Sequence, residues 1–285
     1  MGKKRDYFET LGKLEIMEEG ENKTPSSKYP LFETHCHLDY LKENELNKVI
    51  HLSKDVGIKK IVTISVSPSN FKDVHKLCQT DDMIYGTQGV HPHEAKDWNQ
   101  SICQEVKKDL SNTDKIVAIG EIGLDYYYNH SSQTDQRTAF EEQLQLASEL
   151  DLPVVIHSRD AEDDTIAILK NFSSSLKKKG VIHSFTSKLA LAKFALSEGL
   201  FLGFNGIVTF KNAHDVREAL EICPTDRILI ETDSPFLTPT PHRGKENTPF
   251  YLPFIAQYIS DFKKEKPEIL LPKVYQNSLK FFQID

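Results

Sequence analysis

Short apolar segments recur along this chain, and a segment with helical spacing follows nearly every one of them. The short segments are rich in β-branched residues, whereas the intervening segments place apolar residues three or four positions apart. Near-continuous apolar strands that alternate with helices are typical of a parallel sheet covered by helices. The eight predicted strands lie within residues 29–37, 58–65, 84–90, 115–121, 152–157, 180–183, 200–205 and 227–233.

This alternation predicts an α/β fold, the TIM (β/α)8 barrel, which occupies about 250 residues. The chain has 285 residues, so one barrel nearly fills it. We predict a single barrel domain over residues 29–285 and a short N-terminal arm over residues 1–28. The arm is polar, which favours disorder, although Leu11 and Leu14 suggest a short amphipathic helix.

The clearest helical spacing follows the fourth strand, where Phe140, Leu144, Ala147 and Leu150 fall on one face. Residues 160–172 and 187–198 show a similar pattern, and both are predicted to be helices. After the eighth strand, Leu252, Ile255, Ala256, Ile259 and Phe262 suit a further helix that closes the outer ring.

Charge and composition exclude several classes of protein. The net charge of −7 means that a polyanion would need a local basic patch or bound metal to bind. No apolar segment approaches the roughly 20 residues of a membrane span, and the first residues lack the apolar region of a signal peptide. Four cysteines without a C-x-x-C pair indicate reduced thiols. We expect a cytoplasmic monomer with no membrane partner.

Histidines and acids stand at or just after the ends of six predicted strands. In the first strand side chains alternate, so His35 and His37 point the same way and Cys36 points to the helices. Barrel enzymes build their active sites at the rim where the carboxyl ends of the strands meet. The strand-end residues are His35, His37, His91, His93, Glu121, His157, His183 and Asp233.

These residue types favour a metal site, because a ring of unpaired buried polar groups would be costly. Nitrogen and carboxylate ligands without thiolate suit Zn, Mn, Co or Fe better than Mg. Six ligands exceed one tetrahedral site but fit two divalent ions that share a carboxylate and activate a metal-bound hydroxide. The predicted metal ligands are His35, His37, Glu121, His157, His183 and Asp233.

Residues 30 to 285 resemble the TatD-type deoxyribonucleases of the amidohydrolase-like superfamily of metal-dependent hydrolases. The resemblance implies one metal held by His35, His37 and Asp233, a second held by His157 and His183, and Glu121 between them. The family is described as Mg²⁺-dependent DNases, often acting from the 3′ end. The motifs that carry the resemblance are Glu33–Asp39, Gly89–His93, Gly120–Tyr126, Pro153–Arg159, His183–Phe185, Glu231–Pro235 and Pro241–Lys245.

Two positions depart from the family pattern. Glu33 stands where the family usually has Asp, two positions before His35. Residues 245–248 read Lys-Glu-Asn-Thr where Lys-Arg-Asn-Glu is more usual. The second change removes a positive charge and should weaken phosphate binding.

We therefore predict a metal-dependent hydrolase of ester bonds, a DNase of the 3′-end exonuclease type. Glu121 and Asp233 are its predicted catalytic residues, with Asp233 as metal ligand and general base. Asp125 is expected to orient a ligand histidine. His93 could touch substrate or cap its strand, and the tyrosines at 126–128 could stack bases but are expected to wall the pocket. The predicted substrate-binding residues are His91, His242, Arg243 and Lys245.

Two alternatives remain open at this point. The same scaffold could hydrolyse an aminoacyl ester, as in a mischarged D-aminoacyl-tRNA, or a lactone or an amide. Glu121 stands at the fourth strand end, which argues against an amidohydrolase with a carbamylated lysine there. A non-enzymatic metal-binding protein is less favoured, because a structural site would be closed and would need fewer ligands.

Overall fold

The computed structural model describes residues 26–41, 43–128 and 130–285. The predicted arm and its amphipathic helix therefore lie almost entirely outside the described residues. Its last residues already contact the domain, because the Ser27 N–H donates to the Val56 carbonyl oxygen at 2.9 Å.

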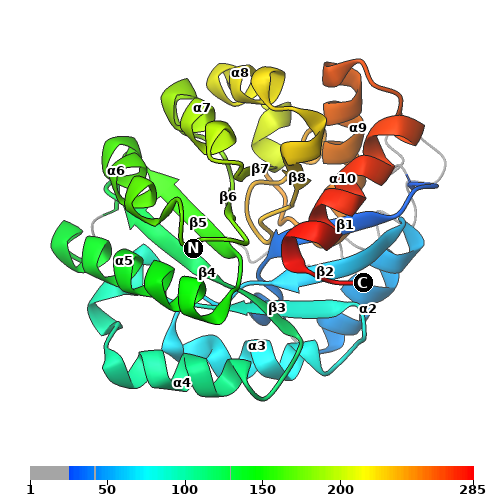
Figure 1. The fold of residues 1–285 in the computed structure, drawn as a ribbon. Coiled ribbons are helices and arrows are strands. Elements are labelled where there is room, and N and C mark those ends of the chain that lie inside the picture. The colour runs from blue at the N-terminus through cyan, green and yellow to red at the C-terminus, as the bar shows by residue number, and fades with distance from the viewer. Residues whose placement is uncertain (1–25, 42, 129) are drawn as a thin grey trace, which may run out of the picture.

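Eight parallel strands form one sheet whose spatial order is the chain order, which confirms the predicted TIM barrel (Figure 1). The fourth strand is longer than predicted and pairs with the fifth as far as Asp125 opposite Arg159. Two glycines, Gly120 and Gly123, interrupt its apolar pattern and hid this extension. The strands are β1 Leu31–Cys36, β2 Ile58–Thr63, β3 Ile84–Gln88, β4 Ile116–Asp125, β5 Val154–Arg159, β6 Gly180–Ile182, β7 Phe201–Phe204 and β8 Ile228–Ile230.

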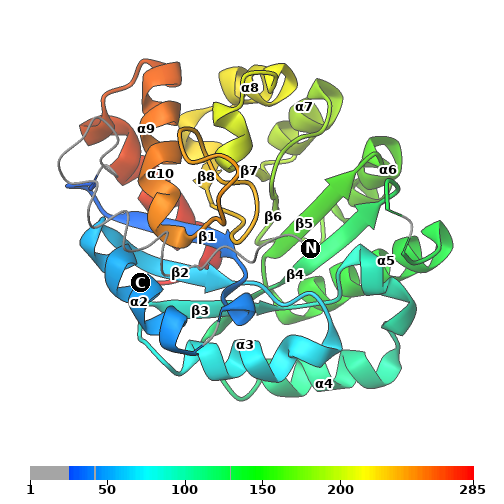
Figure 2. The same ribbon diagram turned by 180° about the vertical axis from the view of Figure 1, so that it is seen from behind.

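Helices surround the strands, as Figures 1 and 2 show from opposite ends. The helices predicted over residues 160–172 and 187–198, and the helix after the eighth strand, are confirmed as α6, α7 and α9. The helices are α2 Glu43–Asp55, α3 Phe71–Cys78, α4 Gln100–Leu110, α5 Gln133–Leu150, α6 Glu162–Phe172, α7 Leu189–Ser197, α8 His214–Ile222, α9 Leu252–Lys263 and α10 Pro267–Phe282.

Neighbouring residues along most strands belong to two different cores. On β5, Val155 lies in an inner core that fills the barrel, whereas Val154 and Ile156 lie in the outer core beneath the helices. Because side chains alternate, His157 and Arg159 follow Val155 on the inner face. The strand therefore directs both polar side chains toward the mouth of the barrel.

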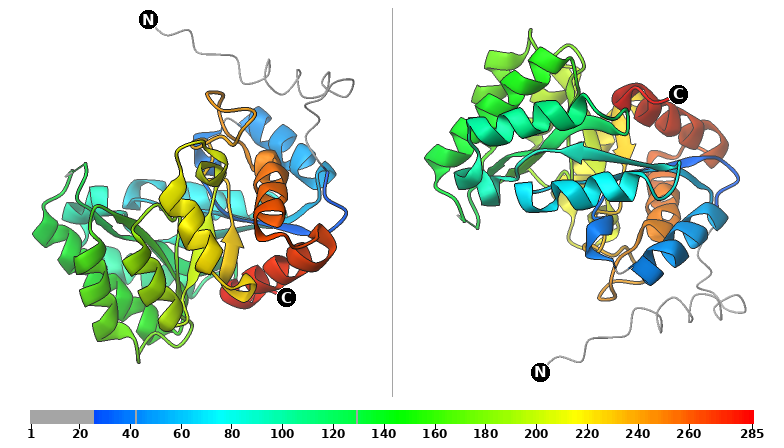
Figure 3. Two further views of the ribbon diagram at one scale, coloured as in Figure 1. Left: turned by 90° about the horizontal axis from the view of Figure 1, so that it is seen from above. Right: turned by 90° about the horizontal axis from the view of Figure 1, so that it is seen from below.

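The last helix closes the base of the barrel, a role that the sequence had not indicated. Two prolines, one of them Pro272 inside α10, obscured its helical pattern. The ring of Phe282 stacks on Phe32 of β1 at 5.6 Å, and Phe281 meets Phe201 of β7 edge-on at 5.3 Å. Figure 3 shows the loop after β8 at one end of the barrel and the C-terminus at the other.

Phe282→Ala is expected to lower the free energy of unfolding by about 3–5 kcal/mol, because it leaves a cavity against the Phe32 ring. Denaturant titration measures this change. Ile269→Ala on the same helix is the matched control, since Ile269 is 49% exposed and should change stability by less than about 0.5 kcal/mol. Equal effects of the two substitutions would contradict a packed base.

The junction between β1 and β8 differs from the other strand junctions. Within the described part of the chain, no strand ladder pairs β8 with β1. Individual hydrogen bonds join them instead: the Thr34 hydroxyl donates to the Ile230 carbonyl at 2.8 Å, and the Asp233 N–H donates to the His35 carbonyl at 2.9 Å. We call this junction the β1–β8 seam.

Among the described residues, none of the helices is both long enough and apolar enough to span a bilayer. The cytoplasmic location stays a prediction.

Candidate active site

The carboxylate of Glu121, inside the barrel on β4, is the centre of a histidine cluster. Its oxygens lie 2.8 Å from His183 Nε2, 3.0 Å from His157 Nδ1, 3.3 Å from His91 Nε2 and 3.4 Å from His35 Nε2. Four strand ends thus bring imidazole nitrogens to a single buried acid. Five of the predicted site residues lie together here, including His91, which was predicted to bind substrate.

Asp233, directly after β8, completes the cluster on the opposite side. Its Oδ1 lies 3.5 Å from His37 Nε2 and 3.6 Å from His35 Nε2. The two histidines do share one face of β1, whereas Cys36 packs into the outer core as predicted. The Asp233 side chain is 13% exposed, against 5% for Glu121, so it is the cluster acid that solvent reaches best.

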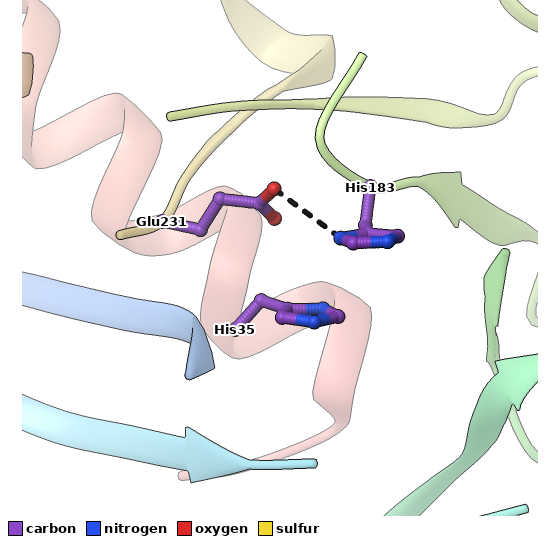
Figure 4. A group of neighbouring side chains, drawn as sticks. All are labelled: His35, His183 and Glu231. Atoms are coloured by element: carbon purple, nitrogen blue, oxygen red, sulfur yellow. Dashed lines mark ion pairs between the residues drawn. The ribbon is translucent and has the colours of Figure 1, made fainter. Parts of the chain in front are cut away.

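A second layer of carboxylates holds the far nitrogens of the histidines. Asp125 Oδ2 lies 3.0 Å from His157 Nε2 and 3.1 Å from His93 Nε2. Glu231 Oε1 lies 3.6 Å from His183 Nδ1 (Figure 4). Hydrogen bonding at one imidazole nitrogen fixes the orientation of the other, so Asp125 aims His157 at Glu121. Glu231 attracts His183 as an ion pair, without a hydrogen bond to its Nδ1 among the described residues.

Figure 4 also shows the rings of His35 and His183 lying face to face. Their centroids are 3.9 Å apart and the planes are inclined by 6°. Two imidazoles that stack so closely cannot both carry a charge without strong repulsion. Burial lowers the pKa of His35, and the charge of His183 lowers it further, so His35 is the neutral member of the pair.

The charges of the cluster support one another around the central acid. Burial would raise the pKa of Glu121, but His183 and then His91 hold it well below its usual value. Burial would likewise lower the pKa of His183, but Glu121 raises it well above the usual value. The site therefore keeps a buried anion among nitrogens, an arrangement suited to a cation.

The donor set fits divalent metal ions. Both ring nitrogens of His35 and Nδ1 of His37 are buried and have no hydrogen-bond partner within the described residues. Such groups are costly unless something satisfies them, and imidazole with carboxylate suits the transition metals. Three sets of side chains place one ligand atom each within 4.8 Å of one another: His35, His37 and Glu121; His91, Glu121 and His157; and His35, His183 and Glu231.

Two of the predicted substrate residues in the loop after β8 pack against aromatic rings. His242 is 2% exposed and stacks on Tyr251 at 4.8 Å, and burial, then Lys245, lower its pKa to about 4. Its environment is that of a packed ring. Arg243 is exposed with its guanidinium 4.2 Å from the Phe210 ring centre. No hydrogen bond or ion pair joins this loop's three residues to Glu121 or its histidines in the described chain.

Sequence reasoning missed three side chains near the cluster. Glu231 was part of a quoted motif but had no assigned role. Glu33, buried at the β1–β8 seam, accepts the Thr232 N–H at 2.9 Å, and burial raises its pKa to about 8. Arg159 follows His157 by two positions on the same strand face, and this spacing was the signal that could have identified it.

The tyrosines after β4 are largely exposed, Tyr127 by 57% and Tyr128 by 49%. Their N–H groups donate to Asp125 Oδ1 at 3.0 and 2.9 Å. The same carboxylate therefore holds the tyrosine turn with one oxygen and His157 with the other.

Comparison with known proteins identifies one family model and several similar proteins. A family model described as TatD related DNase matches residues 32–283. An uncharacterized metal-dependent hydrolase of Buchnera aphidicola is 40% identical over 258 residues, covering 89% of this chain and 96% of the relative.

A protein of Erwinia billingiae named 3′-5′ ssDNA/RNA exonuclease TatD is 33% identical over 244 residues, which cover 84% of this chain and 93% of the relative. The crystal structure of YjjV, a TatD homologue of Escherichia coli, superposes with a TM-score of 0.84 at 26% identity. That match covers 90% of this chain and 98% of the homologue.

Proposed function

As a member of the TatD-related DNase family this chain is a metal-dependent hydrolase, and we propose that it cleaves phosphodiester bonds in DNA from the 3′ end. The observation that carries the proposal is the Glu121 carboxylate within 3.4 Å of four imidazole nitrogens at the barrel mouth. The named activity of the Erwinia relative supports a nucleic-acid substrate and removal from the 3′ end.

We propose that two divalent ions occupy the cluster, of Zn, Mn, Mg or Co type. His35, His37 and Asp233 would hold one ion, His157 and His183 the other, with Glu121 between them. Bound ions of this kind supply Lewis acidity and lower the pKa of the attacking water. The proximity of His91 to Glu121 makes it a further candidate ligand, in place of the substrate contact predicted from sequence.

The chain's own residues then accept a proton and orient the histidines. Asp233 is the general base, because it is the cluster carboxylate most open to solvent and can take a proton from the attacking water. Asp125 holds the far nitrogen of His157 by a hydrogen bond and Glu231 attracts that of His183 across 3.6 Å, so the near nitrogens keep facing Glu121. Hydrolysis of a neutral ester would need the same groups. Recognition of phosphate therefore decides whether the substrate is a phosphodiester or a neutral ester.

Arg243→Ala tests that recognition. A charge-assisted bidentate contact to phosphate is worth about 1.5–3 kcal/mol, so kcat/KM for a DNA oligonucleotide should fall by roughly 10- to 150-fold, mainly through KM. Metal content should not change, since the guanidinium lies on Phe210 and not in the histidine cluster. Steady-state kinetics on DNA and on a small uncharged ester measure the difference.

The two substrates separate the proposed function from its rival. A loss confined to DNA supports phosphodiester hydrolysis. An equal loss on both substrates would indicate that Arg243 only shapes its loop, and would favour an aminoacyl ester, lactone or amide as the substrate class.

A further inference from the structure

Exposed aromatic side chains gather at one end of the barrel. Among the described residues, the large apolar side chains with the greatest exposure include four aromatic ones, all in turns that follow strands. An apolar surface of this kind on a soluble domain commonly marks a binding site. These four are Tyr40 after β1, Tyr127 and Tyr128 after β4, and Phe236 after β8.

A cation lies directly against two of these rings. The Arg159 guanidinium is 4.2 Å from the centre of the Tyr127 ring and 4.7 Å from that of Tyr128. Within the part of the chain that the structure describes, this guanidinium has neither a carboxylate partner nor a hydrogen-bond acceptor. Arginine stacked on aromatic rings keeps its edge N–H groups free for an anion.

The arginine and the tyrosines are fixed relative to the histidine cluster. Arg159 lies two residues beyond His157 on the inner face of β5. The Tyr127 and Tyr128 N–H groups donate to Oδ1 of Asp125, and Oδ2 of the same carboxylate contacts His157. The Arg159 guanidinium and the exposed tyrosine rings therefore lie beside the proposed catalytic centre, at the carboxyl ends of β4 and β5.

We propose that Arg159, Tyr127 and Tyr128 form a nucleotide subsite for an unpaired strand. The guanidinium binds a phosphate next to the bond being cleaved, and a tyrosine ring stacks the adjoining base. Stacking on an aromatic side chain requires a free base face, which a paired strand offers only at its end. The inference rests on the proposed function and assigns the residues that recognise an unpaired nucleotide of the substrate.

The test measures binding, so that it does not depend on turnover. The metal-loaded protein is titrated with a fluorescent phosphorothioate oligothymidylate, which resists hydrolysis, over a series of salt concentrations. Each phosphate contact to a single strand contributes about 0.7 to the slope of log K against log salt. Arg159→Gln should therefore weaken binding and lower this slope by about 0.7.

The tyrosine variants should behave differently from the arginine variant. Tyr127→Ala should weaken binding by roughly 5- to 150-fold with the salt slope unchanged, because a stacked base adds no ionic contact. Tyr127→Phe should bind as the parent does, since the ring face remains. A fully paired duplex offers a free base face only at its ends, so its binding should be much less sensitive to Tyr127→Ala than that of the oligothymidylate.

Arg227→Gln is the matched control. It removes the same charge, and this guanidinium also lies over an aromatic ring, Phe201 at 5.4 Å, but it precedes β8 and lies at the base. Its salt slope should equal that of the parent. Equal slopes for Arg159→Gln and Arg227→Gln, or no binding by the parent protein, would overturn the subsite.

The two proposals fail in separate ways. If the protein hydrolyses DNA but its binding ignores Arg159 and Tyr127, the subsite is wrong and the proposed function stands. If binding depends on these residues but no nucleic acid is hydrolysed with any divalent metal, the subsite is supported and the proposed function falls.

Discussion

Glu121→Ala is expected to lower kcat/KM for DNA by more than about a thousandfold, the scale of losing a preorganised charged group at the reacting centre. This carboxylate is the one acid that the four histidines His35, His91, His157 and His183 share. Without it, two bound cations would face each other with no anion between them.

The barrel itself should remain folded, because Glu121 contributes to none of the apolar cores. Circular dichroism and turnover are measured on the same preparation. Glu121→Gln keeps the shape without the charge and should be nearly as inactive. Glu142→Ala is the surface control, since this carboxylate accepts a hydrogen bond only from Trp98 Nε1 among the described residues. Activity of Glu121→Ala within tenfold of the parent would refute a bridging role.

Removal of metal should abolish hydrolysis, and full activity should return only when two divalent ions are bound per chain. The reason is the number of converging ligands, which exceeds what one ion can bind. Elemental analysis after reconstitution, paired with turnover at each stoichiometry, checks this. Full activity at one ion per chain would exclude the dinuclear mechanism.

Thermal unfolding provides an independent measurement of the same centre. An ion present at about a thousand times its Kd stabilises the folded state by about 4 kcal/mol, so chelation should lower the Tm. Glu121→Ala should show a much smaller difference between metal-loaded and chelated samples. A Tm that chelation leaves unchanged in the parent would contradict a buried metal centre.

Strand number, strand order and most of the histidine cluster could be predicted from the sequence. The strands can be recognised as near-continuous apolar segments because both of their faces are buried. Alternation of side chains then assigns His35 and His37 to the same face. Parallel strands gather their carboxyl ends at one rim, so residues as far apart as Glu121 and His183 could be placed together without a structure.

Distances across the barrel could not be predicted from the sequence, and three residues illustrate this. His91 reaches Glu121 at 3.3 Å because of how its turn bends, which no strand pattern encodes. His242 belongs to a loop motif, yet its ring packs on Tyr251. Arg159 carries the same alternation signal as His157, but only the structure shows that no acid neutralises it among the described residues.

A metal ion bound across the β1–β8 seam would also reduce the conformational entropy of the chain. The bonds across the seam join residues such as Thr34 and Ile230, 196 positions apart in the chain. An ion held by His35 and His37 on one side and Asp233 on the other would act as a reversible crosslink that closes this long loop. The first and last strands have no ladder between them, so this junction would separate most readily when the ion leaves.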